Sequence, residues 1–128
     1  MIRLLTVCLM LVFFPPQEDA IRDIGIAMKA GSARELTTFF NKTVEIRIDG
    51  RSSNYSRNQA EAVLKDFFEK YPSRDFVYTV NFKKGSSTDD LKYTIGLYTH
   101  EKGSFRVVML IKKIDNAYLI DTLNFSKE

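Results

Sequence analysis

Few residues of this chain that are capable of acid–base chemistry occur in apolar stretches where a fold could bury them. Asp121 is the carboxylate set most deeply in such a stretch. Three phenols could join it to form an acid and phenol set: Tyr78, Tyr93 and Tyr98. Such a set abstracts a proton only if the base lies within about 3 Å of it and has a pKa shifted by burial. A charge pair between Asp121 and Arg106 on the neighbouring stretch is the simpler interpretation, so we expect no catalytic residue.

Histidine and cysteine are too scarce for metal chemistry. The single histidine, His100, lies beside Glu101-Lys102-Gly103, a sequence typical of a hairpin tip, so we expect it to be exposed. The single cysteine, Cys8, lies in an N-terminal apolar run, and this combination excludes the usual zinc spacings. Gly85-Ser86-Ser87 precedes a predicted strand, so it lacks the helix N-terminus that would hold a phosphate. We therefore expect no metal and no cofactor.

Length and charge indicate one globular domain without a nucleic-acid surface. The chain has 128 residues, with 19 lysines and arginines against 16 aspartates and glutamates, and a formal net charge of +3. Its basic residues are spread among acids instead of being grouped along one stripe. A chain of this length buries one core and is too short for two. We expect a single domain and no nucleic-acid partner.

The N-terminal residues have the pattern of a signal peptide. Arg3 precedes an unbroken apolar run from Leu4 to Phe14, which is too short to span a bilayer. A small-x-small cleavage site is missing after the run, so a buried N-terminal helix is the alternative. We expect residues 1–16 to be a signal peptide and residues 17–128 to be the mature domain. The predicted location is periplasmic or extracellular, without lipid anchoring and without a stable membrane span after processing.

Capping signals and apolar periodicity predict three helices. Ser32 and Ser56 each precede a glutamate or glutamine by three positions, the capping box that opens a helix. Apolar residues then recur every three or four positions, as in a helix that packs on a sheet. The predicted helices are residues 18–30, 33–40 and 57–71.

Alternating apolar and polar residues predict five strands. Short separators such as Asp115-Asn116 favour hairpins between the last four of them. The polar residues 51–55 have no such alternation, and we expect a loop there. The predicted strands are residues 43–49, 76–82, 91–99, 105–113 and 118–125.

This order of elements predicts an α+β fold, with three helices on one face of a curved, mostly antiparallel sheet. The chain resembles the nuclear transport factor 2-like superfamily of cone-shaped folds, and within it a family of small exported bacterial proteins of unknown function. The narrower resemblance rests on Glu35-Leu36, Phe40, Val44-Glu45, Tyr55-Ser56, Gln59-Ala60-Glu61, Lys65-Asp66-Phe67-Phe68, Gly85-Ser86-Ser87, Tyr93, Ile95-Gly96 and Phe105-Arg106-Val107. It implies the cone fold and export, and it assigns no activity.

The function we expect is a non-enzymatic binding or interaction module that holds a small apolar ligand in the cone. The superfamily also contains ketosteroid isomerases and SnoaL-like cyclases, so an enzyme of the isomerase or dehydratase type is the alternative. A structural protein that self-associates is the second alternative. Helices over a curved sheet leave a gap at the wide end unless large side chains fill it. The expected lining of that pocket is Phe40, Val63, Phe67, Tyr71, Phe76, Tyr78 and Val80.

The outer face of the sheet is the expected homodimer contact. With a two-residue turn at Asp115-Asn116, Ile111 opposes Ile120, Val108 opposes Leu123 and Arg106 opposes Phe125. Both faces of the sheet are then apolar, and helices can cover only one of them. The superfamily resemblance also implies dimers formed through this face. The expected contact residues are Arg106, Val108, Leu110, Asp121, Leu123 and Phe125, while the turn after His100 decides whether Tyr93, Ile95 and Leu97 join them.

Overall fold

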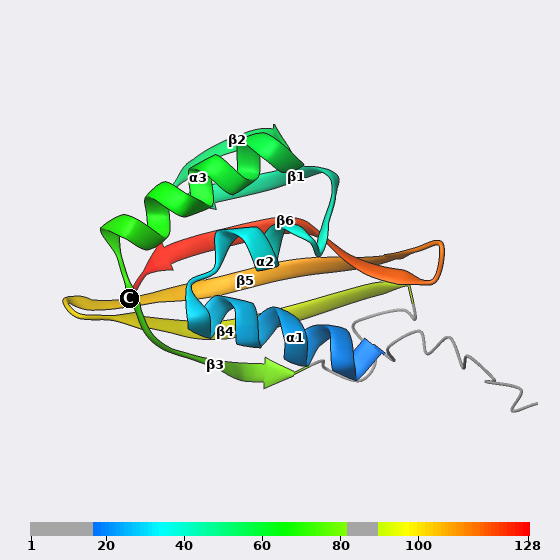
Figure 1. The fold of residues 1–128 in the computed structure, drawn as a ribbon. Helices are drawn as coiled ribbons and strands as arrows, with labels where there is room; N and C mark the ends of the chain where they lie inside the picture. The colour runs from blue at the N-terminus through cyan, green and yellow to red at the C-terminus, as the bar shows by residue number, and fades with distance from the viewer. Residues whose placement is uncertain (1–16, 82–89) are drawn as a thin grey trace, which may run out of the picture.

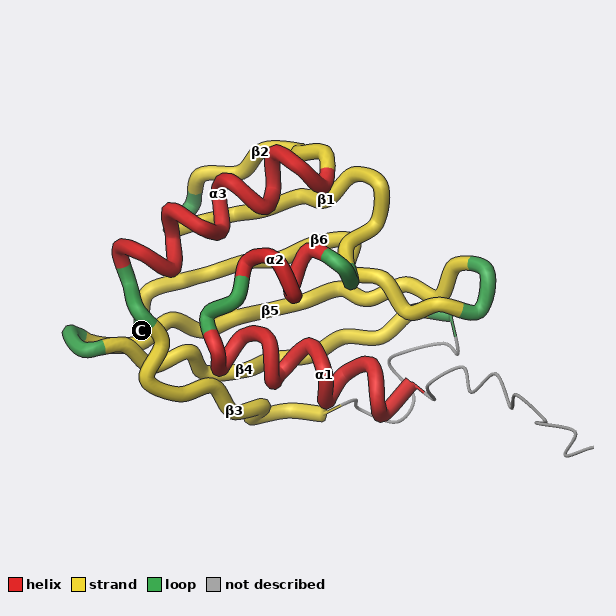
Figure 2. The backbone as a smooth tube through the Cα atoms, viewed as in Figure 1, coloured by secondary structure: helices red, strands yellow, loops and turns green. Residues whose placement is uncertain are grey.

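The computed structural model describes residues 17–81 and 90–128, where three helices cover one face of a six-stranded sheet (Figures 1 and 2). The strand order is β2-β1-β6-β5-β4-β3; β1 and β6 run parallel and all other neighbours antiparallel. The elements are α1 (Gln17–Ala30), α2 (Ala33–Thr37), β1 (Phe40–Ile48), β2 (Arg51–Ser56), α3 (Arg57–Lys70), β3 (Ser73–Asn81), β4 (Leu91–His100), β5 (Gly103–Ile114) and β6 (Ala117–Lys127). The predicted α+β architecture is confirmed. The predicted signal peptide and the Gly85-Ser86-Ser87 turn lie outside the described residues.

Both predicted capping serines open helices. The Ser32 hydroxyl accepts a hydrogen bond from the Glu35 amide at 3.2 Å at the start of α2. At the start of α3, Ser56 and Gln59 form the reciprocal pair of a capping box. Helix α2 ends at Thr37, earlier than expected, because β1 already begins at Phe40.

The described elements include a strand that the sequence did not predict. Asp49 and Gly50 have φ of 50° and 87° and form a two-residue hairpin turn, after which Arg51 pairs with Ile48. The expectation of a loop at residues 51–55 is therefore wrong. Strand β2 is an edge strand whose side chains are exposed except for half-buried Tyr55, so it carries no apolar alternation.

The β5–β6 hairpin has the predicted turn. Asp115 and Asn116 have φ of 48° and 64°, as a type I′ turn requires, and Ile111 pairs with Ile120 as expected. The register then shifts by one residue, because Asp121 is a β-bulge without an opposing partner.

This bulge reverses the predicted orientation of the end of β6. Beyond it Met109 pairs with Leu123 and Val107 with Phe125, and all four side chains are buried. The pairings expected for Leu123 and Phe125 are wrong, and so is their assignment to the dimer face. One extra residue in a strand moves every later side chain to the other face.

The turn between β4 and β5 has two residues, with His100 paired to Gly103. Tyr98 therefore faces the helices and is fully buried, whereas Tyr93 on the opposite face is 50% exposed. Ile95 and Leu97 share that outer face and are half-buried. All three residues that the turn was expected to place thus lie on the outer face.

The inner face of the sheet is filled by large side chains. Phe67 on α3 is the centre of an aromatic cluster, with its ring 4.2 Å from that of Phe125 and 5.7 Å from that of Tyr98. Helix α1 packs beside the edge strand β3, where the Tyr78 hydroxyl donates a hydrogen bond to the Ile21 carbonyl at 2.7 Å. In the described ranges no helix has the length and apolar character needed to cross a membrane.

Candidate functional site

The most promising hollow, which we call the end cleft, lies where the C-terminal end of α3 meets the β1–β2 turn. Figure 1 shows this end of α3 close to the C-terminus and to the β4–β5 turn. The cleft has a volume of about 400 Å³. Its lining residues are Ile48, Asp49, Arg51, Val63, Asp66, Phe67, Lys70, Tyr71, Phe105 and Lys127.

Three aromatic rings form the floor of the end cleft. The ring of Phe67 lies 5.2 Å from those of Tyr71 and Phe105, and the latter two are 4.9 Å apart. The rings are tilted or edge-on to one another, which is the favourable geometry for aromatic pairs. Phe67 and Phe105 are buried and Tyr71 is half-buried, so the floor is supported by the core.

Charged side chains form the rim of the end cleft. Lys127 pairs with Asp49 at 3.5 Å, and the Lys70 ammonium lies 5.5 Å from the centroid of the adjacent Tyr71 ring. Within residues 17–81 and 90–128, neither Arg51 nor Lys70 has a carboxylate within ion-pair distance. Three cations and two acids, the second being Asp66, leave the lining with a charge of 3 − 2 = +1.

A smaller hollow of about 290 Å³ adjoins the end cleft and shares Tyr71, Phe105 and Lys127 with it. His100 lines this hollow, with its ring 5.0 Å from that of Tyr71 and 5.3 Å from that of Phe105. The expectation of an exposed histidine is wrong, since these rings leave it half-buried. Its Nδ1 accepts a hydrogen bond from the Lys102 amide at 3.3 Å.

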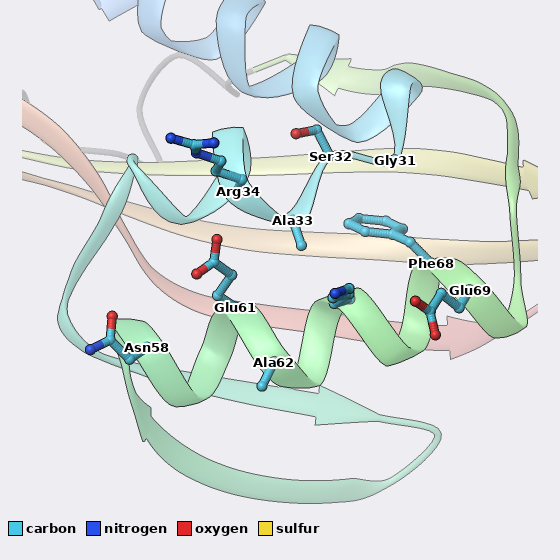
Figure 3. A pocket seen from close by; sticks show the side chains of 10 residues that line it. Gly31, Ser32, Ala33, Arg34, Asn58, Glu61, Ala62, Phe68 and Glu69 are labelled. Atoms are coloured by element: carbon cyan, nitrogen blue, oxygen red, sulfur yellow. The ribbon is translucent and has the colours of Figure 1, made fainter.

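A larger groove of about 650 Å³ runs between the start of α2 and the side of α3 that faces it (Figure 3). Two acids and two bases line it: Glu61, Glu69, Arg34 and Lys65. Phe68 is the single aromatic side chain among its lining residues, and the Ser32 hydroxyl there already caps α2. The groove has neither an aromatic floor nor an excess charge, so the end cleft is the better candidate site.

The one acid and the three phenols considered as an acid and phenol set do not share one face of the sheet. Tyr78 and Tyr98 face the helices, while Asp121 and Tyr93 lie on the outer face. Asp121 pairs with Lys112 at 3.3 Å and accepts a hydrogen bond from the Asn41 amide at 3.4 Å, so the expected pair with Arg106 is wrong.

Both inward phenols have structural partners. The Tyr98 hydroxyl donates to the Tyr71 carbonyl, and burial raises the pKa of Tyr98 to about 12. Burial likewise raises the pKa of Tyr78, whose hydroxyl donates to Ile21. Both phenols are neutral at physiological pH and serve to hold the backbone of α1 and of the α3–β3 connection. Among the described residues no group of His, Cys, Asp and Glu side chains could hold a metal ion.

Comparison with known families assigns the chain to one of them. A family model described as a domain of unknown function, DUF4783, matches residues 21–126. The chain belongs to the DUF4783 family. Among curated proteins none matches it.

Solved structures agree with this assignment. A DUF4783 family protein from Bacteroides ovatus ATCC 8483 is 30% identical, with a TM-score of 0.76 over 83% of this chain and 93% of that one. A second, from Bacteroides uniformis ATCC 8492, is 24% identical, with a TM-score of 0.77 over 84% and 95%. An NTF-2 like protein of unknown function from Silicibacter pomeroyi DSS-3 is 12% identical, with a TM-score of 0.62 over 87% and 92%. The nuclear transport factor 2-like fold is therefore confirmed for this DUF4783 domain.

In the DUF4783 domain the predicted pocket residues do not line one common pocket. Val63, Phe67 and Tyr71 line the end cleft. Phe40 and Phe76 are buried in the core, and Tyr78 is half-buried against it. The backbone of Val80 pairs with Ile95, and its side chain lies outside the described part of the chain.

Sequence reasoning missed Arg51, Lys70 and Phe105 as lining residues of this DUF4783 cleft. Arg51 belongs to the stretch that was expected to be a loop, so nothing indicated which way its side chain points. Lys70 has the ordinary position of a base near a helix C-terminus, which by itself does not indicate a binding site. Phe105 is the third residue after a hairpin turn, and only that turn's length places it inside.

Proposed function

We propose that this chain is an exported, non-enzymatic binding module that holds a small apolar ligand in the end cleft. The aromatic floor of the cleft is the observation that carries the proposal, since three packed rings, of which Tyr71 is half-buried, line an opening of the core. A volume of about 400 Å³ falls within the range of small-molecule sites. Export is supported by the apolar run within residues 1–16, which precedes the family match beginning at residue 21.

The separation of Asp121 from the inward phenols Tyr78 and Tyr98 favours binding over catalysis. General acid–base chemistry requires its groups to converge on one substrate. Asp121 lies on the opposite face of the sheet from the inward phenols. The hydroxyls of those phenols already donate hydrogen bonds to backbone carbonyls. The carboxylates of the end cleft, Asp49 and Asp66, are exposed at its rim.

Native mass spectrometry of the protein purified from the envelope fraction of its own host tests ligand and export together. We expect a chain that starts between Pro15 and Ile21 and carries the added mass of a small molecule. Tyr71→Leu, which removes one ring of the floor, is expected to lose most of that added mass. Glu69→Ala in the other groove is the matched control and should retain it. Intact Met1 in the cytoplasm would contradict export, and an unliganded wild-type chain would contradict the ligand.

We also propose that the chain forms a homodimer through the outer face of the sheet. Val77 and Tyr93 are 48% and 50% exposed there. They form an outer patch with four half-buried neighbours on β4 and β5: Ile95, Leu97, Val108 and Leu110. A second copy of the same patch would cover it by two-fold symmetry.

Val108→Lys is expected to convert the dimer into a monomer at micromolar concentration, because it places a charge within the outer patch, directly beside Ile95. Light scattering on the mature chain measures the change. Asn54→Lys, on the exposed polar strand β2, is the matched control and should leave the dimer intact. A wild-type monomer under the same conditions would contradict the proposal.

A further inference from the structure

The charged side chains at the end cleft indicate the charge of its ligand. The two unpaired cations come from different elements, Arg51 from the start of β2 and Lys70 from the last turn of α3. In the part of the chain that the structure describes, each lacks an ion pair, although the cleft also contains Asp49 and Asp66. Asp49 is engaged by Lys127 at 3.5 Å, which leaves Asp66 as the one competing acid of the lining.

The cations adjoin the aromatic floor. The Lys70 ammonium lies 5.5 Å from the centre of the Tyr71 ring, and the same ring is part of the floor. Aromatic rings and positive charge without a carboxylate partner thus line one hollow. A ligand that matches both has an aromatic or apolar body and one negative charge, and electrostatic complementarity of this kind selects one ligand over its neutral analogue.

The larger groove lacks this combination. Its two bases, Arg34 and Lys65, are balanced by Glu61 and Glu69, and its lining contains one aromatic residue. The end cleft has a surplus of one positive charge and three rings. Its volume of about 400 Å³, with an adjoining hollow of about 290 Å³, suits a molecule of one or two rings.

We infer that the ligand of the end cleft is a small aromatic monoanion, such as a carboxylate. Its ring lies on the aromatic floor, chiefly against the half-buried Tyr71, and its charge lies toward the lining cations Arg51 and Lys70. This inference rests on the proposed binding function and adds the chemical class of the ligand.

Two probes of equal ring size test the inference: 2-naphthoate, which is ionised at neutral pH, and neutral 2-naphthalenemethanol. Titration calorimetry on the mature protein gives the ratio of their affinities. We expect 2-naphthoate to bind about tenfold more tightly, since two exposed cations each contribute modestly. In Arg51→Gln/Lys70→Gln the ratio is expected to fall to about one, while the affinity for the alcohol changes little.

The matched control is Arg34→Gln/Lys65→Gln, which lowers the net charge equally but in the other groove. It should retain the preference for 2-naphthoate, and circular dichroism verifies that both variants fold. Equal binding of the two probes by the wild-type protein would overturn the anionic ligand and leave the apolar site intact. Binding of neither probe would overturn the proposed function as well. Loss of the preference in the control, or its survival in Arg51→Gln/Lys70→Gln, would overturn the assignment to these two cations.

Discussion

Leu123→Lys is expected to abolish folding of the domain. Leu123 is 0% exposed and lies in the core beneath the helices, because the bulge at Asp121 turns it inward. An ammonium at this position would be buried without a carboxylate partner, which costs several kcal/mol. Since a domain of this size has a total stability of about 5–15 kcal/mol, we expect little folded protein. Circular dichroism and urea unfolding measure the outcome.

Thr122→Lys is the matched control, because the same charge is placed one residue earlier. Thr122 pairs with Leu110 on the outer face, where a lysine can extend into water. We expect this variant to fold, with a free energy of unfolding within about 1 kcal/mol of wild type. In a hairpin without the bulge the two positions would exchange faces. A folded Leu123→Lys together with an unfolded Thr122→Lys would therefore refute the bulged register.

Gly96→Ala is expected to lower the free energy of unfolding by about 3 kcal/mol, the cost of overpacking a rigid core position. A Cβ at Gly96 would lie 2.4 Å from Cζ of Phe76 and 3.1 Å from the Val77 carbonyl oxygen. The Phe76 ring is buried and packs edge-on against Tyr78 at 5.1 Å, so it has little room to withdraw. Movement of Tyr78 would in turn disturb its hydrogen bond to α1.

Phe76→Leu in the Gly96→Ala background tests the cause of that loss. A smaller side chain should relieve the clash, so we expect the double variant to be more stable than the sum of the single changes predicts, by about 1 kcal/mol or more. Urea unfolding of all four proteins gives this coupling. Strict additivity would indicate that the alanine acts through the backbone instead of through the Phe76 ring.

Much of the secondary structure could be predicted because its signals are local. Ser32 and Ser56 cap the helices that they were expected to open, and Asp115-Asn116 forms the expected turn. Strand β2 could not be predicted in the same way. It is held by backbone hydrogen bonds to β1 at the sheet edge, so its side chains carry no buried face for a pattern to show.

The candidate site was predicted in part. Val63 and Phe67 lie four residues apart on α3, Tyr71 follows its last residue, and all three line the end cleft. Phe40 and Phe76 were expected beside them because they also face the helices. They are core residues instead, since whether inward side chains line a hollow or fill it depends on the volume of every neighbour.

The sequence by itself determined the helices, the hairpin turns and the α+β layering, because capping, turn geometry and apolar periodicity act over a few residues. Only the tertiary structure decided which side chains share a face and where a hollow remains. Leu123 and Phe125 turn inward through one bulge, which alternation alone does not reveal. Arg51, Lys70 and Phe105 are far apart in the chain and meet at the end cleft because strand pairing and the packing of α3 bring them together.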